Sequence, residues 1–264
     1  MNSKQLQAQI KNKIEILANL VDEAEFSNEI QKYLKTISKF HNYSPSNQWL
    51  IAWQKPDASQ VAGFHTWKNK FKRYVKKGEK SIRILAPVFK NIENENGDKI
   101  KKLVYFRTVS VFDISQTDGD ELEELNVWKS REKLPELENA LKSYAGELGL
   151  TVTVSNELGG AEGMINSKNE IYINPDAGTE TLAHEIAHFL AGHTKENGHK
   201  KTHEVRELEA ESVAFTVCDY FNLSADNAPN YLYLTGLKAD DLKNSLDTIS
   251  KLSKKMIEGI EAIA

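Results

Sequence analysis

The spacing of apolar residues divides the chain into stretches of different character. Apolar side chains recur at three- and four-residue steps through residues 4–40, which predicts helical structure there. Two runs rich in β-branched and aromatic residues follow at 81–89 and 103–115, separated by a polar segment with an Asn-Gly step. They predict a β-hairpin with a polar tip at 90–102. A short apolar segment at 47–54 predicts another helix ahead of the hairpin.

The second half has a different order of elements. Residues 134–149 repeat with helical periodicity and end at a glycine. Two short β-branched runs come next, separated by a glycine-rich segment, and three helical stretches follow. These segments are 151–155, 170–174, 181–191, 202–221 and about 239–262. Because residues 116–125 are acidic and lack apolar periodicity, we predict an α+β fold with two domains, at residues 1–120 and 128–264.

Composition narrows the class of protein. The chain has 264 residues, of which 40% are hydrophobic and 27% charged, enough for a proper core. Cys218 is the single cysteine, so no internal disulfide is possible, and its apolar surroundings predict a buried side chain. No stretch resembles a signal peptide or approaches the roughly 18 apolar residues of a membrane span. We expect a soluble, cytoplasmic protein with no membrane partner.

The net charge of −4 conceals an uneven distribution. Most acids lie in the second half, whereas residues 67–83 carry eight cations and one acid, interleaved with aromatic residues. A positive surface with flat side chains suits single-stranded nucleic acid. The candidate DNA-binding residues are Trp67, Lys68, Lys70, Lys72, Arg73, Lys76, Lys77, Lys80 and Arg83. The same stretch also fits a solvated lysine face over core aromatics, or a surface for an acidic protein partner.

The segment TLAHEIAHFLAGH, residues 181–193, places two histidines on one helix. Four residues turn about 400°, so His184 and His188 project about 40° apart and can reach one ion. Glu185 lies too far round the helix to join them as a ligand, but it can reach a water at the metal as general base. The motif alone is weak. Its apolar neighbours strengthen it, because two buried imidazoles without partners would be costly.

A third ligand must come from another element, since a catalytic zinc site uses three protein ligands and an open position. The helix predicted at 202–221 carries three alternating acids. Glu207 and Glu211 share one helical face, so we assign Glu207 as the ligand and Glu211 as the carboxylate that orients a ligand histidine. Glu209 points elsewhere and fits a solvated acidic face, which is also the alternative for all three.

Neighbouring segments carry weaker signals. The strand predicted at 170–174 could offer an edge to an extended peptide, although an ordinary turn and strand fit equally well. His193, His199 and His203 follow the metal helix, and we interpret them as loop histidines outside the catalytic set.

Together these residues predict a zinc-dependent metalloendopeptidase with Glu185 as its catalytic residue. Zn²⁺ lowers the pKa of bound water towards about 7, and Glu185 would take the proton and return it to the leaving amine. Two imidazoles and a carboxylate also bind Mn²⁺, Fe²⁺ or Co²⁺, so the identity of the metal stays open. The protein substrate is unknown.

At these motifs the second half resembles a known family. The segments TLAHEIAHFL and ELEAESVAF, with GG and IYINP upstream, resemble the ImmA/IrrE-like metallopeptidase domain, which has a zincin-like fold. The resemblance implies Glu207 as the third ligand and places Glu211 where the family more often has Asn.

The first half resembles a second family. The stretch from NYSPSNQWLIAW to SIRILAPVF resembles the N-terminal domain of ArdC-type antirestriction proteins. That resemblance implies a domain for single-stranded DNA, with double-stranded DNA left open, joined to a peptidase domain in a protein of a mobile element. The alternative is a DNA-shielding protein whose metal site is structural or catalytically idle. A protease acting on a repressor, with a basic domain for an acidic partner, is a third interpretation.

Overall fold

The computed structural model describes residues 1–20, 23–93, 99–122, 134–194, 201–223 and 237–263. The chain forms two compact units of mixed helix and strand, which confirms the predicted α+β class. One unit comprises Met1–Ile16 and Ser46–Glu124, and the other comprises Leu17–Pro45 and Leu125–Ala264. The second unit therefore includes residues 17–45, which the sequence prediction placed in the first domain.

The helical region predicted at 4–40 consists of two helices. α1 spans Ser3–Ala18 and α2 spans Glu23–Lys39, while residues 21 and 22 lie outside the described residues. Most of α1 belongs to the first unit and α2 belongs to the second, so the apolar residues of 4–40 contribute to two separate cores. The buried positions are Leu6, Ile10 and Ile14 in α1 and Ile30, Leu34 and Ile37 in α2.

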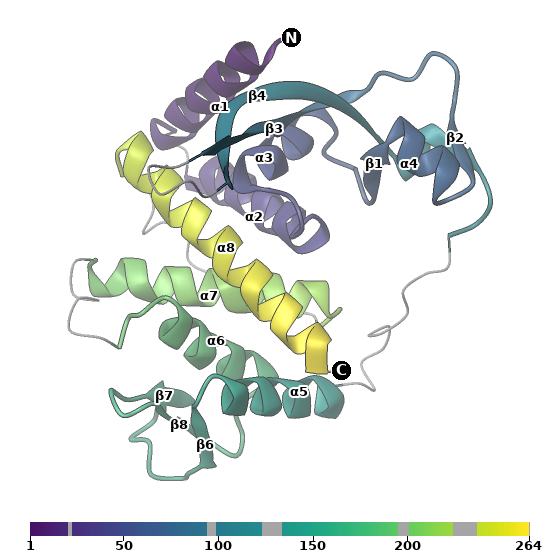
Figure 1. Cartoon of the computed structure of the whole chain (residues 1–264). Coiled ribbons are helices and arrows are strands. Elements are labelled where there is room, and N and C mark those ends of the chain that lie inside the picture. The colour runs from purple at the N-terminus through teal and green to yellow at the C-terminus, as the bar shows by residue number, and fades with distance from the viewer. Residues whose placement is uncertain (21–22, 94–98, 123–133, 195–200, 224–236, 264) are drawn as a thin grey trace. The chain divides into compact units, whose positions relative to one another are not determined.

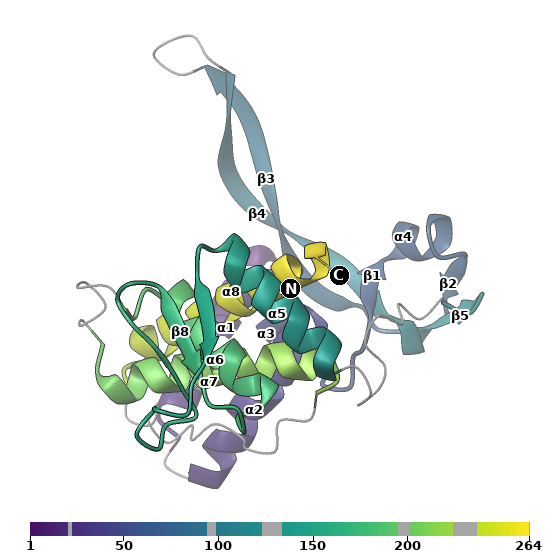
Figure 2. The same ribbon diagram turned by 90° about the horizontal axis from the view of Figure 1, so that it is seen from below.

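A long β-hairpin forms the frame of the first unit. β3 (Ile82–Glu93) and β4 (Lys99–Asp113) pair antiparallel with a register shift between Val88 and Phe89. β1 (Val61–Gly63) pairs with the other edge of β4. The strands continue into the segment predicted as a polar tip, and Figure 2 shows β3 and β4 running side by side as two long ribbons.

The helix α3 (Pro45–Gln54) covers the inner part of the open edge of β3. The side-chain amide of Asn47 donates to the carbonyl of Leu85 at 2.9 Å and accepts from its N–H at 2.8 Å. Gln54 forms the same pair of hydrogen bonds with Arg83, both at 2.9 Å. These amides satisfy backbone groups that an edge strand otherwise leaves to solvent. Trp49 on the same helix is a core residue.

Short elements complete the first unit. They are α4 (Phe64–Asn69), β2 (Arg73–Val75), the 3₁₀ turn η1 (Ile114–Gln116) and β5 (Thr117–Gly119), which pairs antiparallel with β2. Trp67 anchors α4, because its ring is 1% exposed and its indole N–H donates to the carbonyl of Phe112 at 2.8 Å. The basic residues 68–83 therefore follow directly after a side chain that is held in the core.

The second unit combines helices with a three-stranded sheet (Figure 1). Its elements besides α2 are α5 (Leu134–Glu147), β6 (Thr151–Val154), β7 (Gly163–Ile165), β8 (Glu170–Ile173), α6 (Thr179–Leu190), α7 (His203–Tyr220) and α8 (Ala239–Ile263). In the sheet, β8 lies between its parallel neighbour β6 and its antiparallel neighbour β7. The helix α7 packs against α2, α6 and α8, and its Cys218 is buried as predicted.

None of the helices in the described part of the chain combines the length and apolar content needed to cross a membrane. The longest, α8, instead buries one face, where Leu246, Ile249 and Ile257 are fully covered. Its Gly259 lies against Tyr144, where an added Cβ would come 2.1 Å from the ring, so α5 and α8 approach closely at this position.

Candidate functional site

The helix α6 carries the HExxH residues and is fixed by its apolar face. Leu182 and Ile186 are buried, with Ala183 and Ala187 completing the face. The side chains of His184 and His188 lie one turn apart on the adjoining face, with 20% and 11% of each side chain exposed. The helix therefore holds both imidazoles at the boundary of the core.

Three side chains predicted as metal ligands lie together. The Nε2 atoms of His184 and His188 are 2.9 Å apart, and Oε2 of Glu207 on α7 is 3.4 Å from each of them. In a tetrahedral zinc site with bonds of about 2.0–2.1 Å, ligand atoms lie about 3.3 Å from one another. The separations in this cluster thus fit a small divalent cation with three protein ligands, and His184, His188 and Glu207 could hold one.

The charges in this cluster favour a cation. Hydrogen bonds from His184 and His188 hold the pKa of Glu207 well below its ordinary value, so the carboxylate is ionised. Burial lowers the pKa of His188, although Glu207 partly opposes this shift. Burial also acts to lower the pKa of His184, but Glu207 and Glu185 outweigh it, and the net shift is upward. A metal requires neutral imidazoles and an ionised carboxylate. The ionised Glu207 and the lowered pKa of His188 suit a cation, whereas the raised pKa of His184 means that a proton competes with the metal at this residue.

Glu185 lies beside the three candidate ligands in a different environment. Its residue is 6% exposed, and burial raises the pKa of its carboxyl group to about 7, with a further contribution from the charge of Glu207. The carboxyl group accepts a hydrogen bond from the backbone of Ile165 on β7. Gly163 makes this approach possible, because a Cβ there would lie 3.1 Å from Oε1 of Glu185. A carboxyl group that titrates near neutral pH suits proton transfer.

Of the two predictions about the neighbouring acids, the one for Glu209 needs correction, and the one for Glu211 stays a prediction. His193 contacts the second ring nitrogen of His188, because its Nδ1 lies 3.0 Å from Nδ1 of His188. Glu211 is half-buried, and its charge contributes to the raised pKa of His184. Glu209 is completely buried rather than solvated, because His193 and Lys201 pair with it. A spacing argument along one helix could not reveal these partners, which come from the loop after α6.

The remaining loop histidines have separate positions. His203 begins α7 and is therefore a helical residue rather than a loop residue; its Nδ1 lies 3.4 Å from Oε1 of Glu207, whereas Oε2 of Glu207 contacts the imidazole pair. His199 falls outside the described residues.

The strand predicted to offer a peptide edge is not an edge. β8 is the middle strand of its sheet and pairs on both sides, so it has no free ladder for a substrate. The strand nearest α6 is β7, which is an outer strand of the same sheet. The short glycine-containing run that became β7 was too brief to recognise as a strand from its pattern.

The predicted DNA-binding residues mostly lie on the surface of the first unit. The exposed cations are Lys68, Lys70, Lys72, Lys76, Lys77, Lys80 and Arg83. Arg73 is half-buried, and its guanidinium hydrogen-bonds to Thr117, Gly119 and Asp120. Trp67 is a correction, because its buried ring cannot stack on a base. The exposed aromatic residues near these cations are Phe64 and Tyr74.

Each half of the chain matches a known protein family. Residues 2–132 match the family described as the N-terminal domain of anti-restriction factor ArdC. Residues 146–218 match the peptidase M78 family, described as the IrrE N-terminal-like domain. The fold and the site thus define a protein that joins an ArdC-type N-terminal domain to an IrrE-like domain of the metallopeptidase type. The chain belongs to the ArdC-type antirestriction proteins.

Similar proteins agree with this arrangement. The metal-free crystal structure of the antirestriction protein ArdC from plasmid R388 has a TM-score of 0.53 and 20% identity, covering 83% of this chain and 84% of that chain. The Mn(II)-bound structure gives a TM-score of 0.50 and 20% identity, covering 87% and 96%. The uncharacterized protein pXO2-81 of Bacillus anthracis is 24% identical in a match that covers 73% of this chain. The same match covers only 40% of that relative's length.

Proposed function

We propose that the chain is an antirestriction protein that binds single-stranded DNA through its first unit and carries a metal-dependent peptidase site in its second. The observation that carries the peptidase proposal is the cluster of His184, His188 and Glu207 at the spacing of metal ligands, with buried Glu185 beside it. Zinc is the metal that this ligand set and the HExxH spacing favour. Manganese is the alternative, since the similar R388 protein has a Mn(II)-bound structure.

Glu185 has the position and the proton affinity of a general base. A divalent cation held by the three ligands would acidify a water molecule and polarise a carbonyl group. Glu185 would accept the proton of that water and later donate it to the leaving amine. Its pKa of about 7 lets the carboxyl group do both near neutral pH, and the hydrogen bond from Ile165 keeps it oriented.

The outer strand β7 is the surface that we assign to a peptide substrate. It lies beside α6 and pairs with β8 on one side, and no strand among the described residues pairs with its other edge, which suits an added strand. Met164 in the middle of β7 is 44% exposed, which leaves an apolar side chain at this edge. An extended peptide bound there would pass close to Glu185.

Metal analysis and a hydrolysis assay test the peptidase proposal. Purified protein should contain one equivalent of metal, and His184→Ala and Glu207→Ala should lose it. Glu185→Gln should keep the metal but slow cleavage of a peptide library about 10²–10⁴-fold, because it removes the proton acceptor. Metal retained by both ligand variants would refute the assigned site, and unchanged cleavage by Glu185→Gln would refute the role of Glu185.

The surface of the first unit supports the DNA-binding proposal. Lys77 and Lys80 line a groove together with Lys55, although Asp57 and Glu79 also face it. The outer hairpin adds exposed aromatic residues, Phe89 and Tyr105, and a further set of exposed cations. These cations are Lys90, Lys99, Lys101, Lys102 and Arg107. Exposed rings beside cations are the features that bind single strands without sequence preference.

The salt dependence of binding tests this surface. We expect a labelled single strand to bind more tightly than the duplex. Replacing Lys68, Lys76 and Lys77 by Gln should reduce the slope of log K against log salt by about 2, since each lost phosphate contact contributes about 0.7. Three exposed lysines of α1 provide a matched control for charge: Lys4, Lys11 and Lys13. Equal effects of both triple variants, or no binding at about 50 mM salt, would refute the assignment.

A second candidate function is DNA shielding with a catalytically idle metal site. It is favoured by the division of the two features between units, because the predicted DNA-binding residues belong to the first unit, which has its own core, and the metal cluster belongs to the second. Glu185→Gln distinguishes the two functions, since it should leave DNA and metal binding intact. Full protection of incoming DNA by this variant would favour shielding, whereas lost protection would favour proteolysis.

A further inference from the structure

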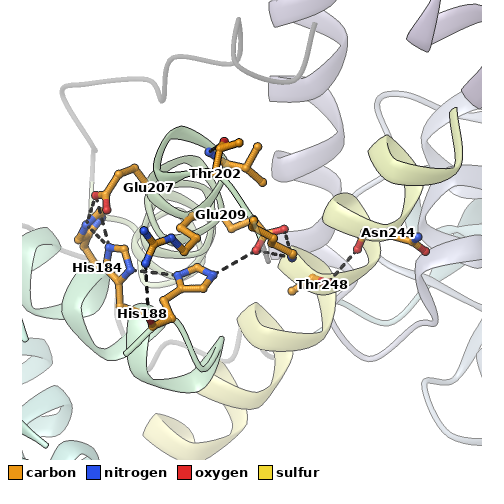
Figure 3. A network of polar contacts seen from close by, with 11 residues as sticks. His184, His188, Thr202, Glu207, Glu209, Asn244 and Thr248 are labelled. Carbon is orange, nitrogen blue, oxygen red and sulfur yellow. Dashed lines mark hydrogen bonds and ion pairs between the residues drawn. The ribbon is translucent and has the colours of Figure 1, made fainter. Parts of the chain in front are cut away.

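A buried chain of polar contacts leads away from the candidate metal centre. His188 turns Nε2 towards His184 and Glu207, and its other ring nitrogen, Nδ1, lies 3.0 Å from Nδ1 of His193. The Nε2 atom of His193 in turn lies 3.3 Å from Oε2 of Glu209. Figure 3 shows these contacts running from the cluster of His184, His188 and Glu207 across to Glu209.

The protons in this chain have a single consistent arrangement. If His188 binds a metal through Nε2, its proton is on Nδ1 and is donated to His193. His193 then carries its own proton on Nε2 and donates it to Glu209. Lys201 donates to both oxygens of Glu209, at 2.5 and 2.8 Å, so the carboxylate stays ionised. Every contact therefore has one donor and one acceptor.

Both supporting side chains are buried. The side chains of His193 and Glu209 are 4% and 0% exposed. Both oxygens of Glu209 are occupied, because Lys201 donates to each of them and His193 contacts Oε2. Ser245 on α8 is a further hydrogen-bond partner of Glu209, so the acceptor is held from two elements.

The end of α6 explains how His193 reaches this position. Gly192 has a φ of +71°, and its N–H donates to the carbonyl of Phe189 at 3.0 Å. The N–H of His193 donates to the carbonyl of His188, also at 3.0 Å. This pair of hydrogen bonds is the Schellman motif, which turns the chain back under the last helical turn. The cap that ends the helix thus places one histidine against the other.

We propose that His193 and Glu209 are positioning residues that hold His188 in the ring orientation and tautomer needed to bind the metal. The proposal rests on the proposed metal site and names the side chains that support it. Loss of such a supporting contact typically weakens metal affinity by about 10–100-fold. A purely structural role would instead lower stability and leave the affinity of the folded protein unchanged.

Two variants of His193 with similar volume separate these possibilities. In His193→Asn, Oδ1 takes the place of Nδ1 and can accept the proton of His188, whereas His193→Leu fills the space without an acceptor. Competition with a chromophoric chelator measures the Zn²⁺ affinity of the full-length protein, and the absorption spectrum of the Co²⁺ form reports ligand geometry. We expect His193→Leu to bind Zn²⁺ about 10–100-fold more weakly with an altered Co²⁺ spectrum, and His193→Asn to recover most of the affinity.

A control and an independent reference complete the experiment. His41 is also a buried histidine of the second unit, but it contacts Tyr220 and Ser38, so His41→Ala should leave Zn²⁺ affinity unchanged even if stability falls. Equal affinity of wild type, His193→Leu and His193→Asn would overturn the proposal. If His193→Leu does not fold by circular dichroism, Glu209→Gln takes its place, with weaker Zn²⁺ binding expected and wild-type affinity overturning the proposal. Undiminished binding by His184→Ala would refute the metal site itself, a separate outcome.

Discussion

Replacing Gly163 by Ala tests how closely β7 approaches α6 beside Glu185. A Cβ at residue 163 would lie 2.7 Å from Cγ2 of Thr181, 3.1 Å from Oε1 of Glu185 and 3.1 Å from Cδ1 of Ile173. The backbone of Gly163 does not have a positive φ, so alanine is sterically allowed by the strand itself. The effect of the substitution therefore comes from its neighbours.

The expected loss of stability follows from these contacts. Thr181 is β-branched, and its hydroxyl group donates to Glu162 at 3.1 Å, so its methyl group cannot rotate away freely. Overpacking of this kind costs about 1–3 kcal/mol, and replacing glycine returns about 0.4–1 kcal/mol through the unfolded chain. The net destabilisation should be about 1–2 kcal/mol.

Gly146 supplies a matched control for the same substitution. It is an exposed residue of α5, and a Cβ there would meet nothing within 4 Å, so Gly146→Ala should stabilise the protein by about 0.5–1 kcal/mol. Urea unfolding followed by far-ultraviolet circular dichroism measures both changes. If Gly163→Ala stabilises the protein as Gly146→Ala does, the close packing of β7 on α6 is wrong, and with it the position assigned to Glu185.

Three further predictions concern the cap, the protonation of the site and the core of the first unit. Gly192→Ala should weaken Zn²⁺ binding and cost about 1 kcal/mol in urea unfolding, because alanine resists the positive φ that places His193; unchanged values of both would contradict this. Metal affinity should fall about tenfold per pH unit below the raised pKa of His184, because a proton then competes with the metal for this ligand. Glu207 has a depressed pKa and stays ionised, so it adds no pH dependence in this range. Chelator competition measures the affinity, and a flat profile over about pH 6–8 would be inconsistent with this prediction. Trp67→Phe should destabilise the first unit by about 2–3 kcal/mol without changing single-strand affinity, because the ring is buried and donates to Phe112; an affinity loss in the stable variant would restore a role in stacking.

The sequence predicted the central part of the candidate metal site because those residues are close along the chain. His184, Glu185 and His188 belong to one helix, and helical geometry alone decides which of them share a face. Predicting Glu207 as the third ligand required one further inference, that a second helix lies against the first. An acidic residue on one face of that helix was then enough to suggest the ligand. The β-hairpin was predicted for a similar reason, because alternation and an Asn-Gly step are local signals.

Other parts of the site depend on contacts that no local pattern encodes. His193 and Glu209 are sixteen residues apart, and they meet only because the cap of α6 and the packing of α7 direct both side chains to one buried point. The same limit applies to Trp67, whose place among exposed cations suggested a surface role, while its indole N–H lies in the core. Burial of a polar or aromatic group is a property of the surrounding elements rather than of its neighbours in sequence.

The amino-acid order by itself therefore determined the longer helices and the long hairpin, the histidine pair with its glutamate and the basic stretch, because each depends on spacing within a few residues. The short elements β1, α4, β2, β5 and β7 were not predicted. Tertiary structure decided which strand is the outer one, which half receives residues 17–45 and which side chains support His188. The physical reason is that periodicity specifies which face of an element is apolar but not which other element covers it. The partners of a buried polar group are settled only when those faces pack together.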